Sequence, residues 1–261
     1  MPADSPTVVL VYPDVLGTYG DRGNAAALVH RARARGMRCR VLRVGVRDPL
    51  PVDADIYLIG GGEDSAVVAA AARLRHSHAL DRAARNGAAI FGVCAGFQML
   101  SAEFSGPDGV RHDGAGLLDV TCGRLEGPRA VGEVLCESAE SLDMGFLTGF
   151  ENHQGDARLG PDARPLGLLV RGVGNGDGRT EGAMQGRVIG TYLHGPALVR
   201  NDGLADHLLQ LVCGPLPQLD DELVQQLRRE RRASALSGHD RPRLGWGRRA
   251  GRLVRHLGHQ R

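Results

Sequence analysis

The sequence predicts an α/β fold in which a mostly parallel, twisted sheet is flanked by helices. Short apolar runs rich in β-branched residues are typical of strands buried on both faces. Helical patterns alternate with these runs, which indicates βαβ units with right-handed crossovers. The length of 261 residues, 42% of them hydrophobic, suits one large domain with a terminal extension. We therefore expect one domain over residues 1–214, followed by a C-terminal helix and a flexible, Arg-rich tail over 215–261.

Strands and helices alternate through the first half of the chain. The apolar run TVVLVY opens it, and Ala25, Leu28 and Ala32 then recur at the spacing of a helix that stops at Gly36. An alanine-rich stretch further on has the composition of a second helix. We expect strands at 7–12, 39–44, 55–59 and 88–93 and helices at 22–36, 64–85 and 97–104.

The second half is richer in short β-like runs and in turn residues. The stretch GVGNGDG at residues 172–178 predicts a turn-rich loop. Two helices follow, the second polar and charged, and beyond Ser234 the Gly/Arg-rich composition predicts a flexible tail. We expect strands at 117–122, 132–136, 166–170 and 188–193 and helices at 204–212 and 220–232.

Composition limits where the protein works and what it binds. No apolar run approaches the roughly 20 residues needed to span a bilayer. The N-terminus lacks the basic and apolar regions of a signal peptide. The five cysteines form no CxxC pair, so neither a zinc site nor a disulfide framework is indicated. We expect a cytoplasmic protein that binds no metal.

Positive charge is concentrated at the C-terminus. Residues 228–261 hold 11 Arg and two acids, although the formal net charge of the chain is only +2. This segment is a solvated extension, a docking segment for the acidic face of a partner, or a segment attracted to anionic lipid at the inner face of the plasma membrane. Trp246 is its only aromatic residue and no nucleic-acid motif accompanies it, so we do not expect nucleic-acid binding.

The run GVCAGFQ at residues 92–98 places Cys94 between a predicted strand and a predicted helix. Small neighbours allow a sharp turn and let a substrate reach the sulfur, as in a nucleophile elbow. The free N–H groups at a helix N-terminus favour a thiolate. A buried core cysteine is the commoner fate of a lone cysteine, but the flanking glycines favour a nucleophile here.

A cysteine nucleophile requires a base. His194 directly follows the predicted strand at 188–193, and sites in parallel sheets lie beyond the carboxyl ends of the strands. The alternative is a turn histidine that only terminates this strand. Asn152 and His153 belong to a polar cluster, ENHQG, which either orients the substrate or the base or is an ordinary loop.

An oxyanion hole requires two converging backbone N–H groups. Ala95 follows the nucleophile and is the first expected donor. The second is expected from Gly61 or Gly62, in the glycine run that follows the strand at 55–59. A flexible turn is the alternative, and a phosphate loop is disfavoured because the chain lacks G-x-x-x-x-G-K-[ST].

These motifs resemble those of the class I, triad-type glutamine amidotransferases. The elbow G-x-C-x-G-x-Q is similar to theirs, and YLHG at 192–195 resembles the cobyric-acid-synthase-like (CobB/CobQ) branch. The resemblance implies a flavodoxin-like fold, Cys94 as nucleophile, His194 as base, and substrate contacts for Arg129 and Gln98. Within that branch the chain is similar to glutaminase subunits of lipid II isoglutaminyl synthase, over residues 7–213, through YGDRGN (19–24), IGGGED (59–64), GAGLLD (114–119), GFENH (149–153) and GVGN (172–175).

The resemblance also implies a reaction and a partner. The chain would hydrolyse L-glutamine and pass the ammonia to a Mur-ligase-like (MurT-like) subunit in a heterodimer. That subunit would use ATP and Mg²⁺ to amidate the α-carboxylate of D-glutamate in the lipid II stem peptide, which gives D-isoglutamine for peptidoglycan synthesis. No cofactor is expected on this chain.

One feature departs from the class I pattern. Most members carry Glu two residues after the base, whereas this chain has Pro196 there. An orienting carboxylate fixes the imidazole tautomer, so we expect an acid from the partner in trans, or from Glu151 or another local residue. Two other functions remain open: an amidotransferase for a corrinoid acid, and a non-catalytic flavodoxin-like module with a redox-sensing cysteine.

Overall fold

A computed structural model describes residues 5–17, 21–62, 64–106 and 108–237. Its centre is a six-stranded sheet in the order β13-β14-β4-β3-β1-β2, with every neighbouring pair parallel except β13 and β14. The predicted α/β fold with a mostly parallel sheet is therefore confirmed. The strands are β1 (Thr7–Val11), β2 (Arg40–Val44), β3 (Ile56–Ile59), β4 (Ala89–Val93), β13 (Ala183–Gln185) and β14 (Val188–Thr191).

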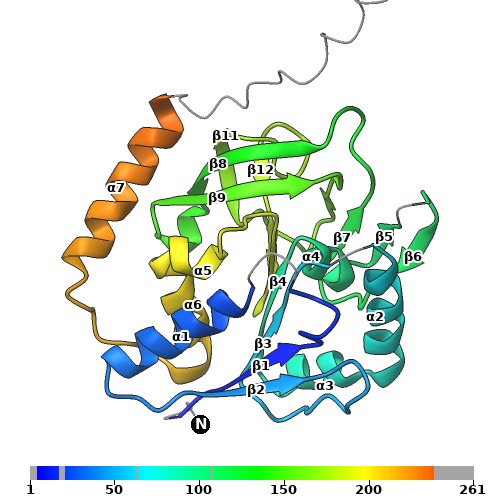
Figure 1. The fold of residues 1–261 in the computed structure, drawn as a ribbon, viewed down its shortest axis with the longest axis horizontal. Helices are drawn as coiled ribbons and strands as arrows, with labels where there is room; N and C mark the ends of the chain where they lie inside the picture. The colour runs from blue at the N-terminus through cyan, green and yellow to red at the C-terminus, as the bar shows by residue number, and fades with distance from the viewer. Residues whose placement is uncertain (1–4, 18–20, 63, 107, 238–261) are drawn as a thin grey trace, which may run out of the picture.

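Helices cover both faces of this sheet, and each face has its own core (Figure 1). Successive side chains of a strand point to opposite faces, so Val8 packs with the core on one side and Val9 with the core on the other. The first side carries α1 (Arg22–Ala34), α5 (Ala197–Arg200) and α6 (Asp202–Cys213), and the second carries α2 (Asp64–Ser77), α3 (Ala79–Arg85) and α4 (Ala95–Leu100).

Two predicted helices are wrong in extent. The helix expected over 64–85 is interrupted at His78, which adopts a left-handed conformation with φ 49° and ψ 19°. The helix expected over 97–104 ends at Leu100, because Ser101 is extended and its hydroxyl donates to Gln98 O at 2.6 Å. Side-chain bonds of this kind compete with the helical backbone pattern, and residues 103–105 form a strand instead.

Two smaller sheets flank the main one near its carboxyl edge. In the first, the long hairpin of β8 (Ala130–Ser138) and β9 (Phe146–His153) lies in the order β12-β11-β8-β9. Strands that were predicted as short runs are confirmed within a few residues, and residues 172–178 form turns as expected. The remaining elements are β5 (Glu103–Ser105), β6 (Arg111–Asp113), β7 (Val120–Cys122), β10 (Arg158–Leu159), β11 (Gly167–Arg171), β12 (Thr180–Glu181) and the short 3₁₀ helix η1 (Glu140–Leu142).

The last described element is α7 (Glu222–Ser237), which lies beside the end of the β8–β9 hairpin where the two strands are connected (Figure 1). Arg228 donates to Met144 O at 2.8 Å and to Phe146 O at 3.0 Å, and the Arg232 guanidinium lies 3.7 Å above the Phe146 ring centroid. The rest of the predicted flexible tail, residues 238–261, lies outside the described residues. Among the helices that are described, none is long and apolar enough to cross a membrane.

Candidate active site

Cys94 lies between the end of β4 and the start of α4, as the sequence predicts. Its backbone has φ 55° and ψ −108°, a conformation that residues other than glycine rarely adopt. The Cys94 N–H donates to Thr191 O, on the neighbouring strand β14, at 2.8 Å. Such strain persists where the surrounding structure enforces it, and it is found at functional positions.

The flanking glycines explain how the chain makes this turn. A Cβ on Gly92 would lie 2.7 Å from Gly96 O, and a Cβ on Gly96 would overlap Ile59 O at the end of β3. Both positions therefore exclude any side chain. The first turn of α4 can then fold back against β4 and β3, which leaves the half-buried thiol of Cys94 at the edge of the sheet.

His194 lies at the same edge. The strands β14 and β4 are parallel neighbours, with Thr191 opposite Val93, so Cys94 and His194 follow the carboxyl ends of adjacent strands. The main chain of His194 pairs with Phe150 of β9 through N–H···O bonds of 2.9 and 3.0 Å. The imidazole is buried, with 4% of the residue exposed.

The environment of His194 favours the neutral imidazole. Burial, together with the charges of His153 and Arg129, lowers its pKa from 6.5 to about 4. A neutral imidazole is the form that accepts a proton from a thiol. Once protonated, however, this imidazole would be an unfavourable buried cation.

His153 is packed behind the site rather than open to it. Its ring stacks on Tyr192 with centroids 3.9 Å apart and an interplanar angle of 9°. Its Nδ1 is hydrogen-bonded with Gly155 O at 2.8 Å, and its Nε2 lies 3.7 Å from the Glu151 carboxylate. This burial favours a supporting role over direct contact with a substrate.

The Glu151 side chain is hydrogen-bonded to the backbone of the turn-rich loop at residues 172–178. Its carboxylate accepts the N–H of Val173 at 3.0 Å and the N–H of Gly174 at 3.0 Å. With 3% of its surface exposed, it has little freedom to turn toward His194.

Arg129 and Asn152 form one unit at the rim. Arg129 Nε donates to Asn152 Oδ1 at 2.6 Å, and its second guanidinium nitrogen donates to Asn152 O at 2.9 Å. The guanidinium is exposed, and its charge acts on His194. It is thus an oriented cation beside the predicted base, suited to a carboxylate of a small substrate.

Gln98 lies below the elbow. Its side chain is hydrogen-bonded with the Tyr192 hydroxyl, and a Cβ on Gly155 would overlap the Gln98 amide nitrogen. The structure thus places Gln98 among the groups that pack under the site.

Gly61, expected as an oxyanion donor, has its N–H engaged by a side chain of the protein. Its N–H donates to Oδ2 of Asp21 at 2.8 Å, so it is not directed at a substrate. Gly62 is bridged with Leu16 and remains a candidate donor. Ala95 is the first residue of α4, where backbone N–H groups have no acceptor within the helix.

Two buried acids that the sequence did not single out support this edge. Asp21 is 6% exposed, and burial raises its pKa to about 6 against the opposing effect of the Gly61 N–H. Glu181, the last residue of β12 and seven residues before β14, is fully buried and accepts the Tyr192 N–H at 3.0 Å and the Thr191 hydroxyl. Burial raises the pKa of Glu181 to about 7. Asp21 lies in the segment YGDRGN, but only three-dimensional contacts connect it, like Glu181, with the site.

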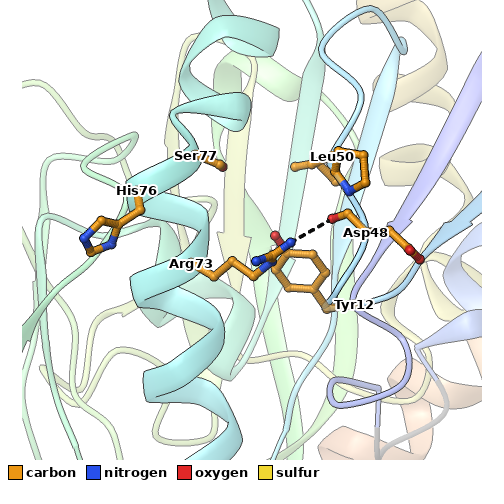
Figure 2. A pocket seen from close by; sticks show the side chains of 7 residues that line it. Tyr12, Asp48, Leu50, Arg73, His76 and Ser77 are labelled. Carbon is orange, nitrogen blue, oxygen red and sulfur yellow. Dashed lines mark hydrogen bonds between the residues drawn. The ribbon is translucent and has the colours of Figure 1, made fainter.

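Two described cavities are lined by none of the predicted site residues. One of about 340 Å³ opens beyond β1, between Tyr12, Leu50 and the α2 residues Arg73 and His76, with Arg73 donating to Asp48 O at 3.2 Å (Figure 2). Within the described part of the chain, no group of three or more His, Cys, Asp or Glu side chains could hold a metal ion.

Residues 7–202 match the CobB/CobQ-like glutamine amidotransferase domain. The GatD subunit of the glutamine-hydrolysing lipid II isoglutaminyl synthase from Staphylococcus aureus (strain N315) is 34% identical over 210 residues, which are 79% of this chain and 84% of that protein. The same subunit from Streptococcus pneumoniae (strain ATCC BAA-255 / R6) is 31% identical over 230 residues, 84% of this chain and 88% of that protein.

The fold has a counterpart among solved structures. A solved crystal structure of a glutamine amidotransferase aligns with this chain at a TM-score of 0.54 and 19% sequence identity. The alignment covers 80% of this chain and 99% of the chain in that crystal structure. This likeness concerns the fold, and it agrees with the parallel sheet and flanking helices described above.

Proposed function

Because the chain belongs to the family of CobB/CobQ-like glutamine amidotransferases, we propose that Cys94 and His194 hydrolyse L-glutamine to glutamate and ammonia. The chain is a glutamine-hydrolysing subunit of the lipid II isoglutaminyl synthase type. The observation that supports the assignment of residues is the strained Cys94 at the end of β4, beside β14, the strand that precedes His194.

The reaction follows from the positions of these groups. The Cys94 thiolate attacks the γ-amide carbon of glutamine while His194 takes the thiol proton and then donates one to the departing ammonia. The Ala95 N–H and an N–H of the glycine run, with Gly62 now favoured over Gly61, stabilise the oxyanion. Water that His194 activates then hydrolyses the glutamyl thioester.

Arg129 is the residue that we assign to substrate recognition. A guanidinium held by Asn152 presents its remaining donors in a fixed direction, which suits the α-carboxylate of glutamine. Asn152 then acts by holding Arg129 through hydrogen bonds. His153 stacks on Tyr192 and Gln98 is hydrogen-bonded with it, so both support the floor of the site.

The electrostatics of His194 support an acid supplied by a partner. The pKa of His194 near 4 opposes the imidazolium that forms when Cys94 gives up its proton. Glu151, the local candidate, is bound by the N–H groups of Val173 and Gly174. A carboxylate delivered in trans would raise the pKa of His194 and stabilise the ion pair.

The acceptor of the ammonia lies on that partner. We propose a MurT-like ligase subunit that binds ATP and Mg²⁺ and amidates the α-carboxylate of D-glutamate in lipid II to give D-isoglutamine. The relatives are named as subunits of such a synthase, and this chain aligns with 84% and 88% of their lengths. A corrinoid-acid acceptor is the competing outcome of an acceptor assay.

The first experiment tests the nucleophile. Cys94→Ser should reduce ammonia release from glutamine by at least about 1000-fold, because a serine hydroxyl is a far weaker nucleophile without a matched base. Cys39→Ser, which changes a half-buried thiol outside the site, is the control and should retain activity. Ammonia release by Cys94→Ser at the wild-type rate would refute the assignment.

The second experiment tests the acid in trans. The isolated chain should hydrolyse glutamine slowly, and addition of the ligase subunit should increase kcat by about 10-fold or more. Full activity of the isolated chain would show that the carboxylate is local or unnecessary.

A further inference from the structure

The first turn of α1 contacts both loops that carry the proposed machinery. Asp21, the N-cap residue, accepts the Gly61 N–H at 2.8 Å. Asn24, only 2% exposed, accepts the Leu198 N–H at 2.9 Å through its side-chain oxygen. One helical turn is thereby hydrogen-bonded to the glycine run on one side and, on the other, to the segment that follows His194.

The backbones approach closely at both contacts. A Cβ on Gly60 would lie 2.5 Å from the Asp21 carboxylate, and a Cβ on Gly23 would overlap the Pro196 ring. Pro196 is the second residue after His194. The glycines therefore let α1 lie against both loops without an intervening side chain.

The glycine run is also held from its other sides. Gly61 O accepts the Gly17 N–H at 2.5 Å, and the elbow residue Gly96 lies against Ile59 O, directly before the run. The two peptide units that flank Gly61 are thus fixed, one through the Gly61 N–H and the other, which includes the Gly62 N–H, through the Gly61 C=O. Its neighbour Gly62, whose N–H we assign to the oxyanion, inherits this orientation.

We propose that Asp21 and Asn24 are positioning residues of the glutaminase: Asp21 orients the oxyanion loop and Asn24 orients the His194 segment. The proposal rests on the function proposed above and goes beyond it, since neither residue touches the substrate. Donors that are held in place before the reaction stabilise the transition state most, and small displacements of a catalytic group have large effects on rate.

The two residues should act on different steps, which separates positioning from general support of the fold. Glutamine hydrolysis needs both the oxyanion hole and the base. Alkylation of Cys94 by iodoacetamide needs the thiolate, and hence His194, but develops no oxyanion. Loss of the Asp21 contact should therefore affect only hydrolysis, whereas loss of the Asn24 contact should affect both reactions.

The test uses the full-length chain, steady-state ammonia release, and mass spectrometry of the Cys94 peptide. Asp21→Ala should lower kcat by about 10-fold or more, with Cys94 alkylation within about 2-fold of wild type. Asp21→Asn, whose side-chain oxygen still accepts an N–H, should return kcat to within about 3-fold of wild type. If Asp21→Ala does not fold, Asp21→Glu, which displaces the carboxylate, should show the same separation.

Asn24→Ala should slow both hydrolysis and alkylation by about 5-fold or more. Asp55→Ala is the matched control, because Asp55 also accepts a backbone N–H, that of Thr7, but at the amino edge of the sheet, opposite Cys94; both rates should remain at wild-type values. Melting temperatures of all variants measure any general loss of structure.

The proposal is overturned if Asp21→Ala keeps wild-type kcat, if it loses both reactions equally, or if Asp21→Asn is as slow as Asp21→Ala. It is also overturned for Asn24 if Asn24→Ala leaves alkylation unchanged. Failure of the proposed function looks different, because wild type and Cys94→Ser would then release ammonia equally.

Discussion

At the scale of single residues, Gly96 shows how the elbow depends on a missing side chain. A Cβ at this position would overlap Ile59 O, a backbone atom that cannot move without displacing β3. Overpacking of this kind typically destabilises a protein by about 1–3 kcal/mol. The same displacement would release the strained backbone of Cys94.

We therefore expect Gly96→Ala to lower the free energy of unfolding by about 1–3 kcal/mol and to reduce kcat by more than about 10-fold. Urea denaturation and ammonia release measure the two effects. Gly132→Ala in β8, where a Cβ would meet nothing within 4 Å, is the control. Equal behaviour of the two variants would contradict the steric explanation.

Glu181 links the site to the pH dependence of stability. Burial raises its pKa from 4.5 to about 7, so the native state binds more protons than the unfolded chain between these values. Its contribution to stability is therefore lost as the pH rises through this window. Glu181→Gln keeps the oxygen that accepts the Tyr192 N–H but cannot ionise.

Relative to wild type, Glu181→Gln should become more stable as the pH rises from 4.5 to about 7, by up to about 3 kcal/mol. Chemical denaturation across this range measures the difference. The exposed substitution Glu126→Gln is the control. Parallel stability curves for Glu181→Gln and wild type would show that Glu181 is ionised in both states.

The sequence predicted the position of Cys94 and His194 relative to their strands, because turns after apolar runs are local features. It could not predict that Gly61 is unavailable as an oxyanion donor, since its acceptor Asp21 lies 40 positions earlier. Glu181 was missed for the same reason. Its partners are Thr191 and Tyr192, and no spacing rule connects a lone acid to a later strand.

At the scale of elements, Arg228 is one of the residues that attach α7 to the rest of the protein. Besides its bonds to two carbonyls of the β9 region, Arg228 forms an ion pair of 3.0 Å with Asp202, whose side chain is only 9% exposed. Removing one partner of such a pair leaves a largely buried charge with fewer donors.

Arg228→Ala should therefore lower the free energy of unfolding by about 1–3 kcal/mol, as measured in urea. Arg229→Ala, one position along the same helix but exposed, should change it by less than about 0.5 kcal/mol. Equal losses for both variants would mean that α7 contributes through helix formation rather than through this contact.

Helix boundaries were the weaker part of the sequence prediction. Alanine-rich composition extends unbroken across residues 64–85, and only the left-handed backbone of His78 divides α2 from α3. The helical pattern of 97–104 likewise continues past Leu100. There the Ser101 hydroxyl and the pairing of β5 with β6 and β7 override the local preference.

At the scale of the whole molecule, the alternation of strands and helices was enough to predict the central sheet. The two small sheets were harder to predict from the sequence, because some of their strands pair with strands that are far away along the chain. Leu168 of β11, for example, pairs with Glu137 of β8. These non-local pairs decide which short runs become strands, and they position Arg129 and Asn152.

The structure also fixes where the C-terminal tail can be removed. Ala235 is buried and its carbonyl accepts Arg171, so a cut after residue 233 would remove part of the contact between α7 and β11. A cut after residue 237 removes only residues 238–261, which carry seven Arg and one acid. We expect this deletion to leave melting temperature and kcat unchanged.

The same deletion should weaken binding to phosphatidylglycerol vesicles, since each basic residue near an anionic surface contributes about 1 kcal/mol. Phosphatidylcholine vesicles and high salt are the controls, and sedimentation is the measurement. If vesicle binding is unchanged but binding to the ligase subunit falls, the tail docks to a protein; if neither changes, it is a solvated extension.

The pairing of Phe150 with His194 has a further consequence. These two residues exchange both of their main-chain hydrogen bonds, and they are the point where β9 of the small sheet meets the segment after β14 of the large sheet. An inhibitor that separated this pair would displace the catalytic base without competing with glutamine. Such a compound would lower kcat at saturating substrate, and rising glutamine concentrations in the cell could not overcome it.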